Sequence, residues 1–224
     1  MVTSKPVIVL ASNSPRRISL LGLGGWSFHV RPSDLDESRT PGETPGEYVL
    51  RVAGDKARVC KRTAVPGEII VAADTTVTID GDILGKPQDS LEAEQMLRRL
   101  RGRKHQVCTG IAVLSVDTGM DITDACITDV PMRSYSDEEI RSYTLSGDPL
   151  DKAGAYAIQH PGFHPVESLT GCFASVMGLP LCHLSRILIK MKVPPKTNIA
   201  AECQSALDYD CPIWQSVLNN EPLG

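Results

Sequence analysis

The sequence predicts an α/β fold in which a mixed, partly antiparallel sheet is flanked by helices. Short apolar runs alternate with amphipathic segments of helical period along most of the chain. Hairpin signals interrupt that alternation, and they argue against a purely parallel, doubly wound sheet. A length of 224 residues and a hydrophobic fraction of 42% are sufficient for one large domain with its own core.

The chain opens with a strand and a helix. Residues 7–10 are a short run of β-branched and leucine side chains, which is typical of a buried strand. Ser14 and Pro15 then predict the start of a helix, because a proline in the first turn lacks only an N–H that would have no partner there. Glycines at positions 22, 24 and 25 end this helix.

The second helix follows a loop. Residues 31–46 are polar and rich in proline and glycine, so they predict a loop. Thr44 and Glu47 form the pattern of a capping box, which starts a helix running to about residue 62. This helix carries Lys56, which in isolation would be interpreted as a surface lysine.

A central strand and a hairpin come next. Residues 68–73 predict a central strand with Asp74 at its end. The turn at 80–82 joins 75–79 to 83–84 as a hairpin, in which a glycine supplies the positive φ angle. Two more strands and three more helices are expected, over residues 107–116, 122–132, 89–100, 136–147 and 176–191.

Composition excludes several classes of protein. The net charge of −4 and an aromatic fraction of 4% argue against nucleic-acid binding, and the same charge argues against an anionic membrane surface. No run approaches the roughly 20 apolar residues that span a bilayer. The seven cysteines are odd in number and form no C-x-x-C pair, which favours reduced thiols in a cytoplasmic protein.

Two groups of residues near strand ends are candidates for phosphate chemistry. Ser12, Arg16 and Arg17 lie at the start of the first helix, where cations oppose the helix dipole and where an anion would compensate them. The alternative is that one or both arginines point into solvent. Asp74, with Thr75 beside it, would hold a metal, a cation or a loop if its strand is buried; otherwise it starts a turn.

The other candidates lie in loops. Glu37 belongs to an acidic pair that could complete a magnesium site, although loop acids are mostly solvated. Lys86 stands between a glycine and a proline, which predict a rigid turn. Its side chain would either contact a phosphate or face water. Residues 148–159 include Asp151, Lys152 and Gln159, and the amide of Gln159 offers the donor and acceptor that reading a nucleobase edge requires. The alternative for that segment is an irregular structural loop.

Seven short segments occur in a specific order along the chain. They are Leu10-Ala-Ser-Asn-Ser-Pro-Arg-Arg17, Asp36-Glu37, Lys56-Ala57, Ala73-Asp74-Thr75, Leu84-Gly85-Lys86-Pro87, Asp151-Lys152-Ala153-Gly154-Ala155-Tyr156 and Gly178-Leu179-Pro180-Leu181. In that order they resemble the Maf-like nucleoside triphosphate pyrophosphatases over about residues 6–191. The resemblance implies a fold like that of the inosine triphosphate pyrophosphatases, with two lobes around a cleft. We therefore expect a Maf-like domain over 1–193 and a tail over 194–224 that is either an extra helix or disordered.

The resemblance also implies an activity. A nucleoside triphosphate would be hydrolysed to the monophosphate and pyrophosphate with Mg²⁺ or Mn²⁺, in a nucleotide-pool sanitising role, and the motifs look like the branch that acts on dTTP and UTP. Asp74 would be the proton acceptor and, with Glu37, a metal ligand. The remaining roles would be phosphate binding by Ser12, Arg17, Lys56 and Lys86, catalytic assistance by Lys86 and Glu37, and base preference set by Arg16, Thr75 and Gln159. A homodimer is implied only by the same resemblance.

One segment departs from the family pattern. Residues 160–165 replace a glycine-rich stretch, and Gly171-Cys172-Phe173 stands where a Ser-Tyr pair often follows glycine. These changes leave two alternatives: a non-catalytic nucleotide-binding module with a regulatory role, and the same hydrolysis on a different, modified nucleotide.

Overall fold

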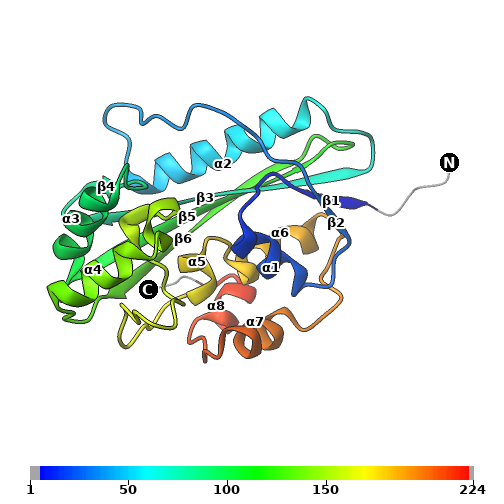
Figure 1. Ribbon diagram of the computed structural model, residues 1–224. Helices are drawn as coiled ribbons and strands as arrows, with labels where there is room; N and C mark the ends of the chain where they lie inside the picture. Colours follow the sequence, from blue (N-terminus) through cyan, green and yellow to red (C-terminus); the bar gives the residue numbers. More distant parts are fainter. Residues whose placement is uncertain (1–5, 222–224) are drawn as a thin grey trace.

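Residues 6–221 are described by a computed structural model, in which one six-stranded mixed sheet has helices on both faces (Figure 1). The strands are β1 (Val7–Leu10), β2 (Phe28–Val30), β3 (Glu68–Ile79), β4 (Asp82–Leu84), β5 (Lys104–Ser115) and β6 (Asp121–Pro131). The sheet order is β2-β1-β3-β5-β6, and β4 pairs with β3. β1 is parallel to β2 and β3, whereas the β3–β5 and β5–β6 pairs are antiparallel. The predicted mixed α/β fold is confirmed.

The helices form two groups on one face of the sheet and a single long helix on the other (Figure 1). They are α1 (Pro15–Gly22), α2 (Pro45–Lys61), α3 (Ser90–Leu100), α4 (Asp137–Leu145), α5 (Phe173–Met177), α6 (Leu181–Lys190), α7 (Ile199–Leu207) and α8 (Trp214–Leu218). Two short 3₁₀ turns, η1 (Asp148–Asp151) and η2 (Ala153–Ala155), follow α4. Among the described residues, no helix is long and apolar enough to cross a membrane.

Alternation along β3 sends successive side chains to opposite faces. Ile70 and Ala72 pack with α2 in one buried cluster, whereas Val71 and Ala73 pack with α1 and α6 in another. A third cluster joins the far end of β3 to α3 and α4. The face opposite α2 is therefore covered by two groups of helices, one at each end, which matches the expected pair of lobes.

Local signals placed most helix boundaries correctly. Thr44 accepts a hydrogen bond from the Glu47 amide and the Glu47 side chain accepts one from the Thr44 amide, so the predicted capping box starts α2. The Asp89 side chain caps α3 by accepting a hydrogen bond from the amide of Glu92. The strand β2 was not predicted, because three residues carry too little periodicity to stand out.

Two sequence predictions about element boundaries were wrong. Asp74 does not end a strand: β3 continues to Ile79, because its antiparallel pairing with β5 runs unbroken from Ile69 to Thr78. The central strand and the first strand of the hairpin are thus one strand. The last helix was expected to begin at Val176, but α5 ends at Met177 and Gly178 adopts φ +109°, a left-handed conformation that stops a helix.

The segment after Pro194 contains α7 and α8, which pack against α6 (Figure 1). Ile199 and Ala200 are buried, as is Val217 of α8. Asn198 caps α7 by accepting a hydrogen bond from the amide of Ala201.

Candidate active site

A large pocket opens where the free edge of β3 is not covered by a neighbouring strand. The β1–β3 pairing ends at Leu10 and Val71, and the β3–β4 pairing begins only at Val77 and Leu84. The stretch of β3 between these pairs, which includes Asp74, therefore faces a gap on one side. The pocket in this gap has a volume of about 870 Å³, enough for a nucleotide-sized ligand.

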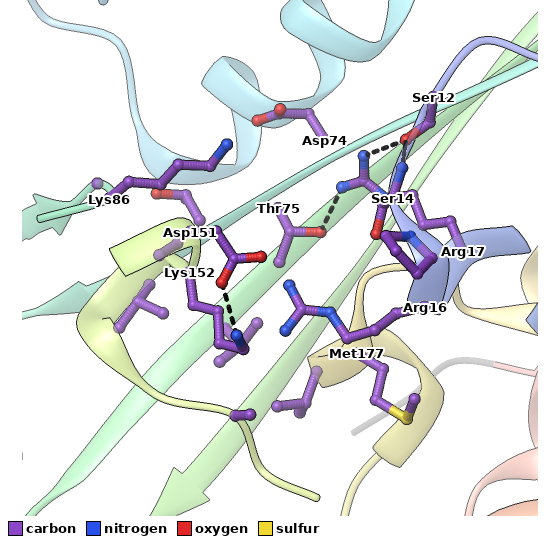
Figure 2. A pocket seen from close by; sticks show the side chains of 18 of the residues that line it. Ser12, Ser14, Arg16, Arg17, Asp74, Thr75, Lys86, Asp151, Lys152 and Met177 are labelled. Atoms are coloured by element: carbon purple, nitrogen blue, oxygen red, sulfur yellow. Dashed lines mark hydrogen bonds and ion pairs between the residues drawn. The ribbon is translucent and has the colours of Figure 1, made fainter. Parts of the chain in front are cut away.

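The predicted site residues gather in this pocket although they come from distant parts of the chain. Figure 2 shows arginines of α1 on one side and Lys86 and Asp151 on the other. The pocket is lined by every residue that sequence analysis assigned to a site: Ser12, Arg16, Arg17, Glu37, Lys56, Asp74, Thr75, Lys86 and Gln159. The structure thus brings the predicted set together, while the role of each residue remains a prediction.

Asp74 is the buried carboxylate of the pocket. It is 5% exposed and lies on the face of β3 that packs against α2, where Lys56 Nζ donates a hydrogen bond to its Oδ1 at 2.7 Å. Burial raises the pKa of Asp74 above its ordinary value, and Lys56 and then Arg17 oppose that shift. Asp74 is therefore held next to a cation but in an environment that favours proton uptake.

Lys56 joins Asp74 to the loop that precedes α2. Its ammonium also lies 2.9 Å from Glu37 Oε1, so one cation pairs with two carboxylates. Sequence analysis would have placed Lys56 at the surface in isolation, but it is 8% exposed. Glu37 is the exposed partner, with 47% of its side chain accessible.

Thr75 points to the opposite face of β3 and anchors Arg17 (Figure 2). Arg17 donates from Nη2 to Thr75 Oγ1 at 3.1 Å, from Nη1 to Ser12 Oγ at 3.3 Å and from Nε to the Gly178 carbonyl at 2.9 Å. Burial lowers the pKa of Arg17, and the negative charge of Asp74 partly offsets this. Contacts from three separate segments thus fix the guanidinium at the pocket wall.

The side chains of Arg16, Lys86 and Gln159 are less constrained than that of Arg17. Lys86 and Gln159 are exposed at the pocket rim. The side chain of Arg16 extends into the pocket between Thr75 and Lys152 (Figure 2). Such side chains can adjust to a ligand, in contrast to the fixed Arg17.

Lys152 is held within its own loop. Its ammonium donates to the carboxylates of Asp148 and Asp151, at 3.0 and 2.6 Å, and to the Asp148 carbonyl. It is 8% exposed, so this part of the segment forms the structural loop that was one of the two interpretations. Asp151 and Lys152 nevertheless line the pocket.

Sequence analysis missed two polar residues of this region. Tyr48 lines the pocket and donates a hydrogen bond to the Glu37 carbonyl at 3.0 Å, and burial raises its pKa to about 12. It lies on α2 eight residues before Lys56, about 80° around the helix axis from it, and this spacing was the available signal. Thr109 of β5 bonds to Thr75 Oγ1 and to the Ser175 carbonyl, but no local pattern marks it.

The carboxylates of Asp74 and Glu37 fit a hard divalent cation. Mg²⁺ is usually held by one or two carboxylates together with substrate phosphates, and Asp74 and Glu37 approach the same ammonium. Within residues 6–221, no group of three or more histidine, cysteine or acidic side chains is arranged to hold a metal alone. Asp74 and Glu37 are thus the two carboxylates that could hold such a cation together with substrate phosphates.

A comparison with known protein families agrees with the motifs. Residues 7–191 match the family described as Maf-like protein. The chain belongs to the Maf-like family. All nine predicted site residues of this Maf-like chain lie within the matched range.

The alignments with curated relatives span nearly the whole length of those relatives. A protein of Anaeromyxobacter dehalogenans named dTTP/UTP pyrophosphatase is 46% identical over 191 residues, which are 84% of the Maf-like chain and 96% of the relative. A protein of Geotalea uraniireducens with the same name is 44% identical over 191 residues, covering 85% and 98% of the two chains.

Solved structures match the Maf-like chain more distantly. The Ham1 protein of Staphylococcus aureus is 18% identical, with a TM-score of 0.41, over 56% of this chain and 71% of its own. A HAM1 protein of Coxiella burnetii is 20% identical, with a TM-score of 0.41, over 57% and 73%.

Proposed function

We propose that this Maf-like protein is a hydrolase that cleaves dTTP and UTP to the nucleoside monophosphate and pyrophosphate. The observation that carries the proposal is the position of Asp74, a buried carboxylate at the uncovered edge of β3 in a pocket that Arg16, Arg17, Lys56 and Lys86 also line. The relatives named dTTP/UTP pyrophosphatase, at 44–46% identity over almost their full length, support the reaction and the substrates.

Asp74 accepts the proton in the proposed reaction. A water oxygen forms a bond to the α-phosphorus as the α–β anhydride bond breaks, and the proton of that water passes to the Asp74 carboxylate. The raised pKa of Asp74 suits this role, because a stronger base takes the proton more readily. Lys56 donates to Oδ1, so Oδ2 is the oxygen we assign to proton uptake.

The cations of the pocket bind the charged part of the substrate. A triphosphate carries several negative charges, and the fixed guanidinium of Arg17 and the ammonium groups of Lys56 and Lys86 offset them, including the charge that develops on leaving pyrophosphate. A divalent cation, Mg²⁺ or Mn²⁺, held by Asp74 and Glu37, would polarise the anhydride and acidify water. Arg16, Thr75 and Gln159 are proposed to set the preference for the base.

The test is a pyrophosphate-release assay on the full chain over a panel of ribo- and deoxyribonucleoside triphosphates with Mg²⁺. We expect pyrophosphate rather than orthophosphate as product, with the highest kcat/KM for dTTP and UTP. Asp74→Asn should lower kcat by about 10²–10⁴-fold without changing the folded structure. Asp129→Asn is the matched control, because Asp129 also pairs with a lysine, Lys104, but lies outside the pocket lining.

The outcomes separate the alternatives. Binding of UTP without product formation would make the protein a nucleotide-binding module, and turnover confined to a modified nucleotide would overturn the substrate assignment. Near-normal turnover by Asp74→Asn would overturn the role of Asp74.

Metal dependence has its own experiment. Removing divalent cations with EDTA should abolish turnover, and adding Mg²⁺ or Mn²⁺ back should restore it. Glu37→Gln should raise the Mg²⁺ concentration needed for half-maximal rate, because one proposed carboxylate ligand is lost. Full activity in EDTA would rule out the proposed cofactor.

Location and assembly belong to the same proposal. All seven cysteines are free thiols, which supports a reducing compartment such as the cytoplasm. A homodimer is proposed by resemblance to the family, and a sizing column with light scattering tests it.

A further inference from the structure

The C-terminal helices α7 and α8 lie outside the family match, which ends at residue 191. They pack against α6, beside α1 and α5, on the face of the sheet opposite α2 (Figure 1). None of their residues lines the pocket. The residues that flank these helices, 193–197 before α7 and Tyr209 between α7 and α8, nevertheless contact the ends of two elements that do line it, α1 and α5.

The first contact is at the C-terminal end of α1. Thr197 Oγ1 donates a hydrogen bond to the Leu23 carbonyl at 2.7 Å, and the amide of Lys196 donates to the Gly24 carbonyl at 2.9 Å. Trp26 Nε1 donates in turn to the carbonyls of Val193 and Pro194. The start of the tail is therefore tied to the end of the helix that carries Arg16 and Arg17.

The second contact is at the N-terminal end of α5. The Tyr209 hydroxyl lies 3.0 Å from the Leu169 carbonyl and 2.8 Å from the Gly171 carbonyl, and its hydrogen is shared between them. The Tyr209 ring packs against Phe173, the first residue of α5, with the ring centroids 5.5 Å apart. A single side chain of the tail thus fixes both the loop before α5 and its first turn.

α5 is the element against which Arg17 is held. The Gly178 carbonyl at its C-terminal end accepts the hydrogen bond from Arg17 Nε, and the Ser175 carbonyl accepts one from Thr109. Met177 and Val176 of α5 line the pocket directly. Any shift of this five-residue helix moves the acceptor of the guanidinium that faces the proposed phosphate site.

We infer that the tail acts as a brace, by which we mean that residues 194–221 hold α1 and α5 in fixed positions relative to each other. Tyr209 is the residue of this brace that positions Arg17. Tyr209 acts through the loop at 169–171, α5 and Gly178, and it does not touch the substrate. The inference rests on the proposed function in one respect: it takes the phosphates of a nucleoside triphosphate as the ligand of Arg17. It adds a positioning residue outside the family match.

The test compares two tyrosine-to-phenylalanine variants of the full chain. Tyr209→Phe keeps the ring against Phe173 and removes only the hydroxyl contacts. Tyr135→Phe is the matched control, because its hydroxyl also donates to a backbone carbonyl, that of Leu97, but at the α3 end of the sheet. Both variants should unfold at slightly lower temperature. Only Tyr209→Phe should speed amide hydrogen exchange in residues 173–178.

The kinetic readout separates positioning from general destabilisation. We expect Tyr209→Phe to raise KM for UTP by about three- to tenfold, the effect of one misplaced hydrogen bond, and to lower kcat as well, because Arg17 also offsets the charge that develops on leaving pyrophosphate. Tyr135→Phe should leave KM within about twofold of the parent. The Kd of UTP carrying an imido group between the α- and β-phosphates, measured by calorimetry, should follow KM.

The results distinguish this inference from the proposed hydrolysis. Unchanged exchange in 173–178, or faster exchange with unchanged Kd, would overturn the brace. A parent protein that binds the imido analogue but does not hydrolyse UTP would overturn the proposed hydrolysis alone. The ratio of Kd values between the two variants would still decide whether Tyr209 positions Arg17.

Discussion

Lys56 is the residue on which the charge state of the pocket depends. Its Nζ lies between the buried Asp74 and the exposed Glu37, at 2.7 and 2.9 Å. An exposed ion pair contributes little, so the contact with Glu37 is weak and readily exchanged for a ligand. The contact with Asp74 is different, because a buried carboxylate without a cation would be strongly driven to take up a proton.

The acidic side of the pH–rate profile should reflect the ionisation of Asp74 and its contact with Lys56. A proton acceptor works only when it is ionised, so kcat/KM should fall as the pH drops through the raised pKa of Asp74. Lys56→Met removes the nearest positive charge, which raises that pKa further, so the fall in kcat/KM should move to higher pH. The measurement is kcat/KM for UTP from about pH 4.5 to about pH 9 at fixed ionic strength. A fall at the same pH in the parent and in Lys56→Met would contradict the coupling.

Gln159 is one of the three residues proposed to set the preference for the base. It lies exposed at the rim of the pocket, with an amide able both to donate and to accept. Gln159→Ala should lower the ratio of kcat/KM for UTP to that for CTP by about threefold or more, the value of one hydrogen bond. Equal ratios in parent and variant would remove Gln159 from base recognition.

Among the elements, the close approach of α2 to the sheet controls whether Lys56 reaches Asp74. Gly110 of β5 stands opposite Asp74 in the antiparallel register, and a Cβ added there would lie 2.5 Å from the Val49 carbonyl of α2. A glycine is therefore required at this crossing by space, not by backbone conformation. The helix rests directly on the strand next to β3.

Gly110→Ala should push α2 away from the sheet. We expect a loss of about 1–3 kcal/mol in the free energy of unfolding from overpacking, and a fall in kcat/KM as Lys56 withdraws from Asp74. Urea unfolding and pyrophosphate release measure the two effects. The control is Gly46→Ala in the first turn of the same helix, where a Cβ meets nothing within 4 Å and stability should hold or rise.

For the whole molecule, buried histidines tie stability to pH. His105 is 3% exposed and shares a hydrogen bond with the Tyr156 hydroxyl, and burial lowers its pKa to about 4. The unfolded chain therefore binds a proton at this residue between about pH 6.5 and about pH 4 where the folded chain does not, so stability falls as the pH drops through this window. Burial also lowers the pKa of His183, which adds to the slope.

His105→Gln should flatten that slope. Glutamine stays neutral, so the loss of stability between about pH 6.5 and about pH 4 should shrink by up to roughly 3 kcal/mol, while His183 and the carboxylates leave a remainder. Urea unfolding at several pH values gives the two slopes. Parallel slopes for parent and variant would show that His105 does not titrate differently on folding.

How much of the molecule the sequence predicts depends on whether the signal is local. Thr44 and Glu47 lie within one helical turn, so their capping box could be recognised without knowing the fold. Residues 75–79 were also predicted as a strand from local pattern, but the continuity of β3 through Asp74 depends on the unbroken pairing with β5, which no local pattern shows. Eight of the nine predicted site residues lie in the ordered motifs, and Gln159 follows the sixth of them. Thr109 lies in none, because its contact with Thr75 comes only from the register of β3 and β5.

The positions of the seven cysteines allow release of the tail to be distinguished from unfolding of the whole chain. Five cysteines are buried in the sheet, in α2 and α6 and at the start of α5, and only Cys203 and Cys211, both in the tail, are partly accessible. Burial raises the pKa of Cys203 to about 11 and that of Cys182 to about 12, so both react slowly while they are folded. Cys182 of α6 packs against Ala200 and Val217 of the tail. In an alkylation time course read by mass spectrometry, release of the tail would therefore appear as modification of Cys203, Cys211 and Cys182 before the other four. Loss of the whole fold would appear as all seven at once.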